Sequence, residues 1–538
     1  MPRFVCSVRH AWFGAALLSC VTLASAAAPD RTPEAASFPF DEATIAELGR
    51  RMQNQELTSH ALVQAYLDRI AAIDKAGPAI NAIIELNPDA LAIADRLDAE
   101  RKSGKVRGPL HGIPVLIKDN IATADRMHTT AGSLALADSI AAQDSTVAAN
   151  LRAAGAVILG KTNLSEWANF RSTHSTSGWS GRGGQTKNPY ALDRNPCGSS
   201  SGTGAAIAAN LAAAGIGTET DGSIICPSAM NGLVGIKPTL GLVSRAGIVP
   251  IAHSQDTAGP MARSVADAAV LLDAIVGADA RDAASKASDE HRTDYSKHLD
   301  ANALKGARIG VVRKLAGFNP DVDSLLAQTI AALKAAGAVV VDPVELPNLG
   351  KYDEAELVVL EYEFKHDVDT YLGALPATAN APRSLADLIA FNGRERAREM
   401  PWFGQELFEK SQARGPLTDH AYLAALARSK RFSGALGIDA ALKKHKLDAL
   451  VAPSVGPAPM TDLVNGDPSG GGSSTAPAAV AGYPDITVPA GFVHGLPVGL
   501  SFFAGAWSEP KLIGLAYAFE QATHARKPPQ FLRTIDSP

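Results

Sequence analysis

The chain has 538 residues, of which 46% are hydrophobic and 20% charged, a composition typical of folded globular proteins. This length allows either several domains or one large α/β domain. The formal net charge of −5 gives no electrostatic reason to expect nucleic acid or an anionic membrane as a partner, so substrate selection must come from a local pocket.

The first 26 residues have the pattern of a secretory signal. Arg3, Arg9 and His10 precede an apolar stretch over residues 11–24, and small residues follow. A basic start, a short apolar run and an Ala-x-Ala end are typical of a segment removed on export, and the run is short for a membrane span. A loosely packed N-terminus is the alternative. We expect residues 27–538 to be one exported domain, periplasmic or secreted, without stable membrane insertion.

Helical and strand patterns begin after this segment. Between residues 41 and 74, apolar side chains recur at helical spacing, and Thr58 has the chemistry of an N-cap for the second of two helices. Residues 114–117 form a short apolar run that predicts a buried strand ending at Lys118.

The rest of the chain repeats this alternation. Further strands are predicted at 156–159, 308–312, 338–341, 448–453 and 486–489, with helices ending at Gly155 and, over 325–336, at Gly337. Alternating helices and strands indicate an α/β sheet covered by helices on both faces. Residues 352–432 are mostly helical, either as an insertion over the sheet or as peripheral helices. Residues 469–474 are predicted to be a flexible loop.

Two segments match known functional sequence motifs, but the residues around them do not have the secondary structure that those motifs require. Residues 155–162 satisfy the phosphate-loop pattern, but their four middle residues are an apolar strand instead of a turn with free N–H groups. Residues 198–202 satisfy the nucleophile-elbow pattern with Ser200 as nucleophile. That elbow requires an apolar strand before it, whereas residues 188–196 are polar. We therefore expect neither phosphate binding nor an elbow.

A third motif covers residues 197–226. A serine- and glycine-rich segment leads into a helix of small residues, predicted over 205–214, and a second polar turn closes it at Gly222 and Ser223. Such a helix packs tightly on a sheet and fixes its two polar ends relative to each other. Gly222 allows close backbone approach to a ligand, with several N–H groups directed at one point. Two glycine-rich turns around a buried helix are the alternative.

At these residues the chain resembles the amidase-signature family. The match covers the serine and glycine segments above and continues at 112–120, 160–166, 232–239, 481–484 and 497–500. The wording Cys-Gly-Ser-Ser-Ser-Gly and Glu-Thr-Asp-Gly-Ser-Ile is most similar to bacterial peptide amidases, which remove the C-terminal amide of peptides. In the commoner family sequence, Gly stands at the positions of Cys197, Ser201 and Asp221. These differences weaken the case for a glutaminyl-tRNA amidotransferase or a fatty-amide hydrolase role in this chain.

The resemblance implies an α/β fold with a mixed central β-sheet sandwiched between α-helices. It also implies that Ser223 is the nucleophile, Ser199 the bridging serine and Lys118 the general base. Burial at a strand end lowers the pKa of a lysine until its amine is neutral and able to accept a proton. In the family the bridging serine follows a cis peptide bond, here Gly198–Ser199.

The resemblance further implies that the backbone N–H groups of Thr220, Asp221, Gly222 and Ser223 hold the oxyanion. No cofactor is expected. No His, Cys and acidic residues have metal-site spacing, so no metal is predicted. Once the signal is removed, Cys197 and Cys226 are the remaining cysteines, and we expect them to be free thiols that support the same site.

The predicted function is an exported amide hydrolase that releases ammonia from small-molecule or short-peptide carboxamides, in particular C-terminal peptide amides. Three alternatives are a general aliphatic or aryl amidase, a periplasmic protein that binds amides without cleaving them, and an ammonia-supplying subunit of a synthetase. Retention of all three triad residues counts against the binding protein, and export counts against the synthetase subunit.

Other polar residues are candidates for lining the pocket. Asn163, Ser165 and Trp167 follow a strand, with loop packing as the alternative. The loop 172–186 carries His174, Trp179, Arg182 and four glycines, at 178, 181, 183 and 184. Glycines leave space beside a bound backbone, so this loop is predicted to provide the open approach for a peptide, with a plain exposed loop as the alternative.

Overall fold

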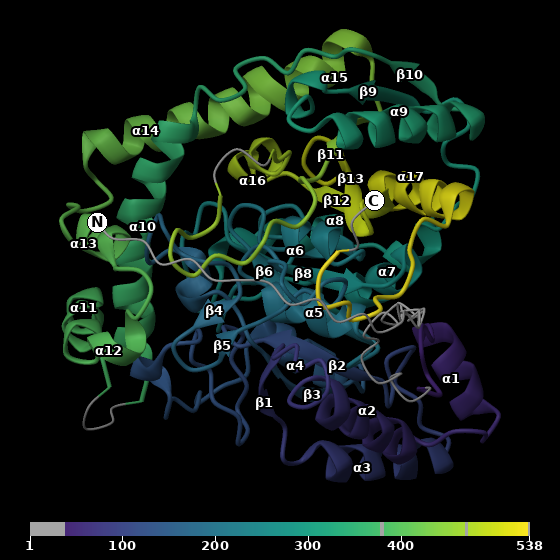
Figure 1. Cartoon of the computed structure of the whole chain (residues 1–538), viewed down its shortest axis with the longest axis vertical. Helices are drawn as coiled ribbons and strands as arrows, with labels where there is room; N and C mark the ends of the chain where they lie inside the picture. The colour runs from purple at the N-terminus through teal and green to yellow at the C-terminus, as the bar shows by residue number, and fades with distance from the viewer. Residues whose placement is uncertain (1–37, 377–380, 469–471, 536–538) are drawn as a thin grey trace, which may run out of the picture. The chain divides into compact units, whose positions relative to one another are not determined.

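The structure, a computed structural model, is built around one mixed β-sheet (Figure 1). It describes residues 38–376, 381–468 and 472–535, so the predicted signal lies outside the described residues. The eleven strands have the order β1-β3-β2-β6-β8-β7-β12-β13-β11-β9-β10. The pairs β3–β2, β2–β6, β11–β9 and β9–β10 are parallel, and the other neighbours are antiparallel. The prediction of a mixed sheet with flanking helices is confirmed.

The strands of this sheet are short, which is typical of buried strands under helices. They are β1 (Ile83–Leu86), β2 (Pro114–Lys118), β3 (Val157–Thr162), β6 (Ala214–Glu219), β7 (Val234–Lys237), β8 (Thr257–Ala262), β9 (Arg308–Val311), β10 (Val339–Val341), β11 (Ala449–Pro453), β12 (Asp485–Val493) and β13 (Leu496–Phe503). A separate two-stranded hairpin consists of β4 (Trp179–Ser180) and β5 (Gly184–Gln185).

Helices flank the sheet along its length. They are α1 (Ile45–Gln53), α2 (Ser59–Ile73), α3 (Ala90–Lys102), α4 (Thr146–Ala153), α5 (Ser201–Ala208), α6 (Ile225–Met230), α7 (Val265–Ile275), α8 (Ser288–His291), α9 (Pro320–Ala335), α15 (Asp439–His445), α16 (Ala476–Ala481) and α17 (Glu509–Thr523). The helices α4, α7, α17 and α9 contact one another in that order, and α5 and α6 form another pair against the strands.

The predicted elements agree closely with the observed ones, and Thr58 caps α2 by accepting a hydrogen bond from the N–H of Ala61. The small-residue helix is the main exception. It spans Ser201–Ala208 instead of 205–214, and Ala214 already begins β6. Asn210 has a φ of 58°, a left-handed conformation that is compatible with the end of a helix but not with its interior. The helix predicted from Leu325 also begins earlier, at Pro320, after an Asn319 N-cap.

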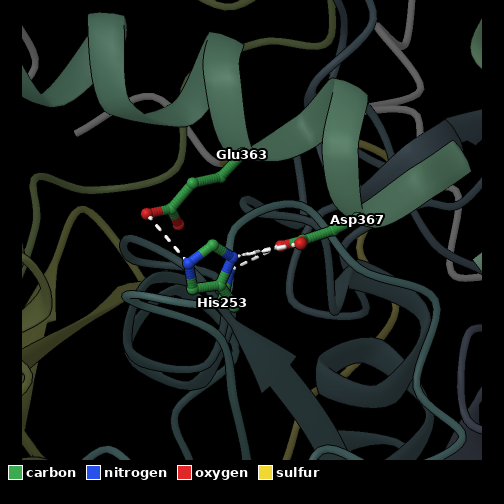
Figure 2. A group of neighbouring side chains, drawn as sticks. All are labelled: His253, Glu363 and Asp367. Carbon is green, nitrogen blue, oxygen red and sulfur yellow. Dashed lines mark hydrogen bonds and ion pairs between the residues drawn. The ribbon is translucent and has the colours of Figure 1, made fainter. Parts of the chain in front are cut away.

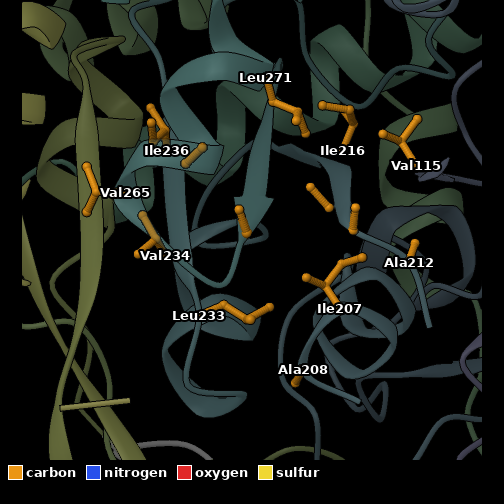
Figure 3. Close-up of a cluster of buried hydrophobic side chains, with 14 of the residues drawn as sticks. Val115, Ile207, Ala208, Ala212, Ile216, Leu233, Val234, Ile236, Val265 and Leu271 are labelled. Atoms are coloured by element: carbon orange, nitrogen blue, oxygen red, sulfur yellow. The ribbon is translucent and has the colours of Figure 1, made fainter. Parts of the chain in front are cut away.

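The core around α5 explains how this part of the chain is fixed (Figure 3). Ile207 and Ala208 of α5 are buried together with Val115 of β2 and Ile216 of β6. Every residue of α5 is buried. Because its side chains are small, the helix backbone lies close to the strands, and its N-terminal end is held at the carboxyl end of β6.

A helical region lies beside the sheet, at the left of Figure 1. It consists of α10 (Asp353–Ala374), α11 (Leu385–Arg394), α12 (Arg396–Glu399), α13 (Glu406–Gln412) and α14 (His420–Lys430), and a π-helical segment, Arg431–Ile438, joins it to α15. Its apolar residues Phe364 and Phe408 share a buried cluster with Trp167, Phe170 and Ile251. The region therefore packs on loops next to the site described below.

None of the helices in the described part of the chain is long and apolar enough to cross a membrane.

Candidate active site

Lys118 is the last residue of β2 and is fully buried. Its Nζ donates to Ser199 Oγ at 2.6 Å and to Thr218 Oγ1 at 2.8 Å, and lies 3.3 Å from the carbonyl oxygen of Thr218. Burial lowers the pKa of Lys118 to about 7, although the negative charges of Asp256 and Glu219 partly oppose this shift. The amine can therefore be neutral near neutral pH.

Ser199 and Ser223 are brought together from the two ends of the serine-rich motif. The backbone N–H of Ser199 donates to Ser223 Oγ at 3.2 Å, and the N–H of Ser200 donates to the carbonyl oxygen of Ser223 at 3.3 Å. Ser199 is 1% exposed and Ser223 is 8% exposed, so both hydroxyls lie at the edge of the protein interior. The structure thus joins Lys118, Ser199 and Ser223 in one hydrogen-bonded series.

Ser200 has a structural position instead. Its hydroxyl donates to the carbonyl oxygen of Thr218 at 3.0 Å and accepts the N–H of the same residue at 3.1 Å. Ser200 is completely buried and ties the start of α5 to β6. This geometry agrees with rejection of the nucleophile-elbow interpretation.

Lys161, the lysine of the apparent phosphate loop, is also buried in the interior. It lies in β3, and its Nζ donates to the carbonyl oxygen of Ile121 at 2.6 Å and to Thr129 Oγ1 at 3.0 Å. The segment is a buried strand and leaves no free turn for a phosphate.

The turn between β6 and α6 places a row of N–H groups beside Ser223. None of the N–H groups of residues 220–223 donates to an acceptor in the described part of the chain. Glu219 Oε2 accepts the N–H groups of Ile224 at 2.7 Å and Ile225 at 3.0 Å, which fixes the turn from below. Gly222 has a φ of +77°, a conformation that glycine adopts without strain. The predicted oxyanion residues therefore form one turn with free donors.

The carboxyl group of Asp221, one of these residues, lies in a buried environment. Its Oδ1 is buried without a hydrogen-bond partner among the described residues. Burial raises the pKa of Asp221 to about 6, and the nearby negative charge of Glu219 adds to this effect.

A cavity of about 680 Å³ opens in front of Ser223. Gly198, the turn 220–223, and both Cys197 and Cys226 form part of its wall. The rest of the lining is Ala168, Asn169, Phe170, Ser177, Asn195, Met230, Ile251, Leu360, Val455, Pro457, Pro459, Asp467, Pro468, Gly472, Ser473 and Thr475. The cavity is large enough for a short peptide or a drug-sized amide.

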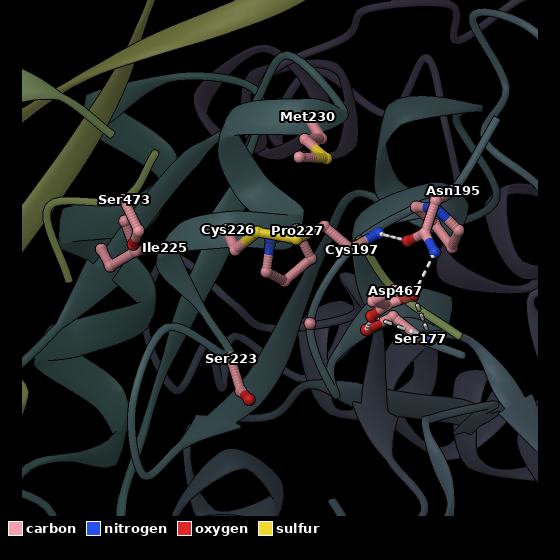
Figure 4. The surroundings of a disulfide bond; sticks show 12 residues. Ser177, Asn195, Cys197, Ser223, Ile225, Cys226, Pro227, Met230, Asp467 and Ser473 are labelled. Carbon is pink, nitrogen blue, oxygen red and sulfur yellow. Dashed lines mark hydrogen bonds between the residues drawn. A yellow bond between two sulfur atoms is a disulfide. The ribbon is translucent and has the colours of Figure 1, made fainter. Parts of the chain in front are cut away.

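The prediction that Cys197 and Cys226 are free thiols is wrong. The two cysteines form a disulfide, with their Cα atoms 5.8 Å apart (Figure 4). Sequence separation alone did not reveal it, because the 28 residues between them include α5 and β6, which run out and back and return the chain to its starting point. The disulfide lines the cavity beside Ser223.

The expectation of a cis peptide bond at Gly198–Ser199 is also wrong. In the described part of the chain the cis bond is Asp342–Pro343, and Gly198–Ser199 is trans. Gly198 has a φ of +60°, and in this conformation the trans amide of Ser199 directs its N–H toward Ser223 Oγ.

Asn163 and Ser165 support the site from behind. Asn163 Nδ2 donates to the carbonyl oxygen of Gly184 and to Thr186 Oγ1, both at 3.0 Å. Ser165 Oγ donates to the carbonyl oxygen of Gly198 at 3.0 Å, and its N–H donates to that of Ser199 at 3.2 Å. Neither residue lines the cavity, so loop packing, the alternative interpretation, is the observed one.

Trp167 does not line the cavity either. It is buried and packs edge-on against Phe408 at 5.9 Å, whereas the next two residues, Ala168 and Asn169, reach the cavity. All three have positive φ values, and this run turns the chain toward the cavity.

The segment 172–186 is the hairpin β4–β5 and not an open approach. Of its residues only Ser177 lines the cavity. Trp179 packs on Phe403 at 5.2 Å, Arg182 pairs with Glu85 at 2.6 Å, and His174 is exposed. The space beside two of its glycines is already filled: a Cβ at Gly181 would meet Glu399, and one at Gly183 would meet Asn163.

Sequence reasoning missed Thr218 and Asp467. Thr218 lies in β6, five residues before Ser223, and its hydroxyl and its carbonyl oxygen both accept hydrogen bonds from Lys118 Nζ. Asp467 accepts hydrogen bonds from the N–H of Ser177 at 3.0 Å and from Asn195 Nδ2 at 2.7 Å, and it lines the cavity (Figure 4). Asp467 lies close to the serine motif only in the folded chain, so no local sequence signal pointed to it.

One group outside the cavity has donors that suit a metal ion: His253, Glu363 and Asp367 (Figure 2). His253 Nδ1 lies 2.9 Å from Asp367 Oδ2, and Nε2 lies 3.4 Å from Glu363 Oε1. The carboxylates also accept the N–H groups of His253 and Ser254. Burial lowers the pKa of His253, but the hydrogen bond to Asp367 and the charge of Glu363 outweigh it and hold the pKa above its usual value. The two carboxylates thus favour the protonated form of the His253 imidazole.

Comparison with known proteins assigns the family. A model of the family described as Amidase matches residues 61–513. The chain belongs to the amidase family. It is 43% identical to a probable amidase of Arabidopsis thaliana over 527 residues, covering 96% of this chain and 97% of the relative.

Two solved structures show the same fold. A peptide amidase in complex with the competitive inhibitor chymostatin is 55% identical, with a TM-score of 0.88, and the match covers 91% of this chain and all of that one. The native peptide amidase from Stenotrophomonas maltophilia is also 55% identical, with a TM-score of 0.86, covering 92% of this chain and all of that one. Together with the family, these similarities establish the protein as an amide hydrolase with an amidase-signature fold.

Proposed function

We propose that this amidase hydrolyses C-terminal peptide amides, with Ser223 as nucleophile, Ser199 as proton relay and Lys118 as general base. The observation that carries the proposal is the position of Lys118 Nζ, fully buried and 2.6 Å from Ser199 Oγ, while the N–H of Ser199 reaches Ser223 Oγ. Burial makes the neutral amine accessible near pH 7.

The proposed reaction uses these three residues, with one proton transfer between the hydroxyls of Ser199 and Ser223. Neutral Lys118 accepts the hydroxyl proton of Ser199, Ser199 takes the proton of Ser223, and Ser223 Oγ bonds to the amide carbonyl carbon. The tetrahedral intermediate collapses when its C–N bond breaks, and the proton returns through Ser199 to the leaving nitrogen, which departs as ammonia. Water then attacks the ester on Ser223 by the same proton route and releases the carboxylic acid.

The turn at residues 220–223 supplies the stabilisation of the intermediate. Its N–H groups have no acceptor within the described protein, so they are available to the oxygen that becomes negatively charged. One such preorganised donor typically contributes about 3 kcal/mol to transition-state stabilisation.

Peptide amides are proposed as the substrate class because of the cavity and the similarity to peptide amidases. A cavity of about 680 Å³ leaves room for amino-acid residues ahead of the scissile amide. Its wall offers a carboxylate, Asp467, and polar groups as well as apolar side chains, which suits a peptide better than a plain hydrocarbon chain. A general aliphatic or aryl amidase activity in the same cavity is the second candidate.

Export of the protein is part of the proposal. It rests on the signal-like residues 1–26 and is supported by the Cys197–Cys226 disulfide, because such bonds persist mainly in oxidising compartments. Expression with a C-terminal tag, followed by fractionation and determination of the N-terminus of the mature protein, tests it. A protein retained in the cytoplasm with its N-terminus intact would contradict export.

Ammonia release from a dipeptide amide by the purified protein tests the activity. The expected result is stoichiometric formation of ammonia and the free dipeptide acid. Binding of the amide without release of ammonia would instead support a non-catalytic amide-binding protein.

A further inference from the structure

The Cys197–Cys226 disulfide connects the two segments that carry the serines. Cys197 lies two residues before Ser199, and Cys226 lies three residues after Ser223. The disulfide therefore links the two serine-bearing segments covalently, close to both hydroxyls. Figure 4 shows it together with Ser223 and Pro227.

On the Ser199 side, the disulfide holds a segment of unusual backbone. Cys197 has a φ of +63° and Gly198 a φ of +60°, so two consecutive residues are left-handed. This conformation is unfavourable for a residue with a Cβ and persists only where the surroundings fix it. The N–H of Cys197 donates to Asn195 Oδ1 at 2.7 Å, and Asn231 Nδ2 donates to the carbonyl oxygen of Pro196 at 2.9 Å.

On the Ser223 side, the disulfide joins the first turn of α6. The N–H of Cys226 donates to the carbonyl oxygen of Gly222 at 2.8 Å, which fixes the turn that contains Ser223. Gly198 and Pro227 are in close contact, since a Cβ at Gly198 would lie 2.7 Å from Pro227 Cδ. The left-handed segment is thus clamped against the start of α6.

The direct hydrogen bonds between Ser199 or Ser200 and Ser223 are long, although Asn231 and Pro227 also hold the two segments together. The N–H of Ser199 reaches Ser223 Oγ at 3.2 Å, and that of Ser200 reaches the carbonyl oxygen of Ser223 at 3.3 Å, both long for hydrogen bonds of this type. The N–H of Ser199 holds the Ser223 hydroxyl beside Ser199, and the proposed proton relay needs the two side-chain hydroxyls to lie close together.

We propose that the disulfide is a positioning element of the active site, which holds Ser199 and Ser223 at the distance needed for proton transfer. This inference rests on the proposed function of the two serines. The sulfur atoms take part in no chemical step. Reduction by a phosphine, which takes oxygen from water and becomes a phosphine oxide as the two cysteines become thiols, frees the left-handed segment, and the amidase loses turnover while it remains folded.

The prediction separates two roles of the disulfide. A positioning role lowers kcat for every amide, including the smallest, because the serines act on all of them. A role limited to forming the cavity wall raises KM for peptide amides and leaves kcat unchanged. Misplacement of catalytic groups by about 1 Å costs on the order of 100-fold in rate, so we expect kcat to fall about 10- to 100-fold.

The experiment compares the oxidised protein, the same protein reduced with a phosphine, and the double variant Cys197→Ala/Cys226→Ala. Kinetics are measured with a dipeptide amide and with acetamide, well below the unfolding temperature of each form, and circular dichroism verifies folding. Mass spectrometry of the linked peptides reports the state of the disulfide. The double variant is the matched control for the reductant, since its activity should not respond to the phosphine.

The expected result is a lower kcat for both amides in the reduced protein and in the double variant, with KM values within about threefold of those of the oxidised protein. Reoxidation of the wild-type protein should restore its kcat. Folded, reduced protein with unchanged kcat would overturn the inference while leaving the proposed function intact. A change in KM alone would overturn it in favour of the wall role. An oxidised wild-type protein that releases no ammonia would refute the proposed function, and this inference with it.

Discussion

At the scale of single residues, the site depends on the burial of one amine. Lys118 Nζ contacts Ser199 and Thr218, and no carboxylate among the described residues hydrogen-bonds to it, so the low polarity of its surroundings outweighs the more distant charges of Asp256 and Glu219. A lysine at the surface would remain protonated near pH 7 and could not accept a proton. In the proposed mechanism, burial at the end of β2 is therefore what allows Lys118 to act as the base.

Replacement of Lys118 tests the proton-accepting role. Lys118→Ala should lower kcat by about 100- to 10,000-fold, the usual contribution of a general base. Lys118→Arg should not restore activity, because a guanidinium remains protonated at neutral pH. Substantial turnover by Lys118→Arg in a steady-state ammonia assay at pH 7 would contradict the role.

The pKa of Lys118 also predicts the pH dependence. The active form is the neutral amine, so kcat/KM should rise with pH, reach half of its plateau near the Lys118 pKa of about 7, and level off above it. The measurement is kcat/KM for a dipeptide amide between pH 5 and pH 9, at a temperature where the protein is stable throughout. Activity that falls as the pH rises through 7 would contradict a neutral-lysine base.

Sequence reasoning could name the candidate residues Lys118, Ser199 and Ser223, which the structure brings together, because their motifs are local. Lys118 follows an apolar run, and Ser199 and Ser223 stand in short polar segments at the ends of a helix and a strand. The disulfide and Asp467 could not be found in this way, since each depends on a tertiary contact between distant segments. The peptide geometry at Gly198–Ser199 was transferred from the family and does not hold for this structure.

At the scale of structural elements, one buried ionic group connects the helical region to the sheet body. Arg171 pairs closely with Glu166 and donates to the carbonyl oxygen of Glu399, at the end of α12, at 2.7 Å. Its guanidinium also lies over the rings of Trp179 and Phe403. All three ionic side chains are fully buried, and burial together with the neighbouring Glu399 raises the pKa of Glu166 well above its usual value, so loss of Arg171 leaves two acidic groups in the interior without their cation.

Arg171→Ala should therefore destabilise the protein by about 3–5 kcal/mol, because Glu166 and Glu399 lose their cation. Chemical denaturation gives the free energy of unfolding. The matched control is Arg398→Ala in α12, the helix that carries Glu399, where an exposed pair with Glu395 should contribute less than about 1 kcal/mol. Equal effects of the two substitutions would show that burial of the Arg171 group does not matter.

Removal of the disulfide should also reduce stability. The closed loop spans 29 residues, which corresponds to about 3–4 kcal/mol in the chain-entropy description of disulfides. The double variant Cys197→Ala/Cys226→Ala should thus unfold at lower denaturant concentration than the oxidised wild-type protein. An unchanged unfolding midpoint would mean that the two segments are held entirely by non-covalent contacts.

Most elements were predictable because hydrophobic periodicity and capping residues act locally, as at Thr58 and β2. The hairpin β4–β5 was not, because its short strands are set by side chains such as Asn163 that pack behind them. The boundary between α5 and β6 was misplaced because alanine is compatible with both a helix and a buried strand.

At the scale of the whole molecule, the sheet fixes the reacting groups and the loops choose the substrate. Lys118 and the turn at 220–223 follow the carboxyl ends of two neighbouring parallel strands, β2 and β6, where ligand sites of α/β sheets commonly lie. Much of the cavity wall comes instead from loops, including prolines and polar residues between 455 and 475, although α6 and α10 also contribute to it. Substrate preference should therefore follow the loops.

This division predicts the substrate preference. A dipeptide amide should be hydrolysed with a higher kcat/KM than a long-chain fatty amide or free glutamine, because contacts with the remote residue contribute to binding of the transition state. Ammonia release is measured for the three compounds under identical conditions. If the fatty amide or glutamine reacts faster, the peptide-amide assignment fails and a broader amidase specificity remains.

The most direct measurement of the central claim is the kcat/KM for ammonia release from a dipeptide amide by the wild-type protein, Ser223→Ala and Ser200→Ala. We predict that Ser223→Ala loses activity by at least about 1,000-fold while keeping its fold, since only the attacking oxygen is removed. Ser200→Ala should retain measurable turnover, because its hydroxyl bonds only to the backbone of Thr218. Near-normal hydrolysis by Ser223→Ala, together with an inactive but folded Ser200→Ala, would contradict the account.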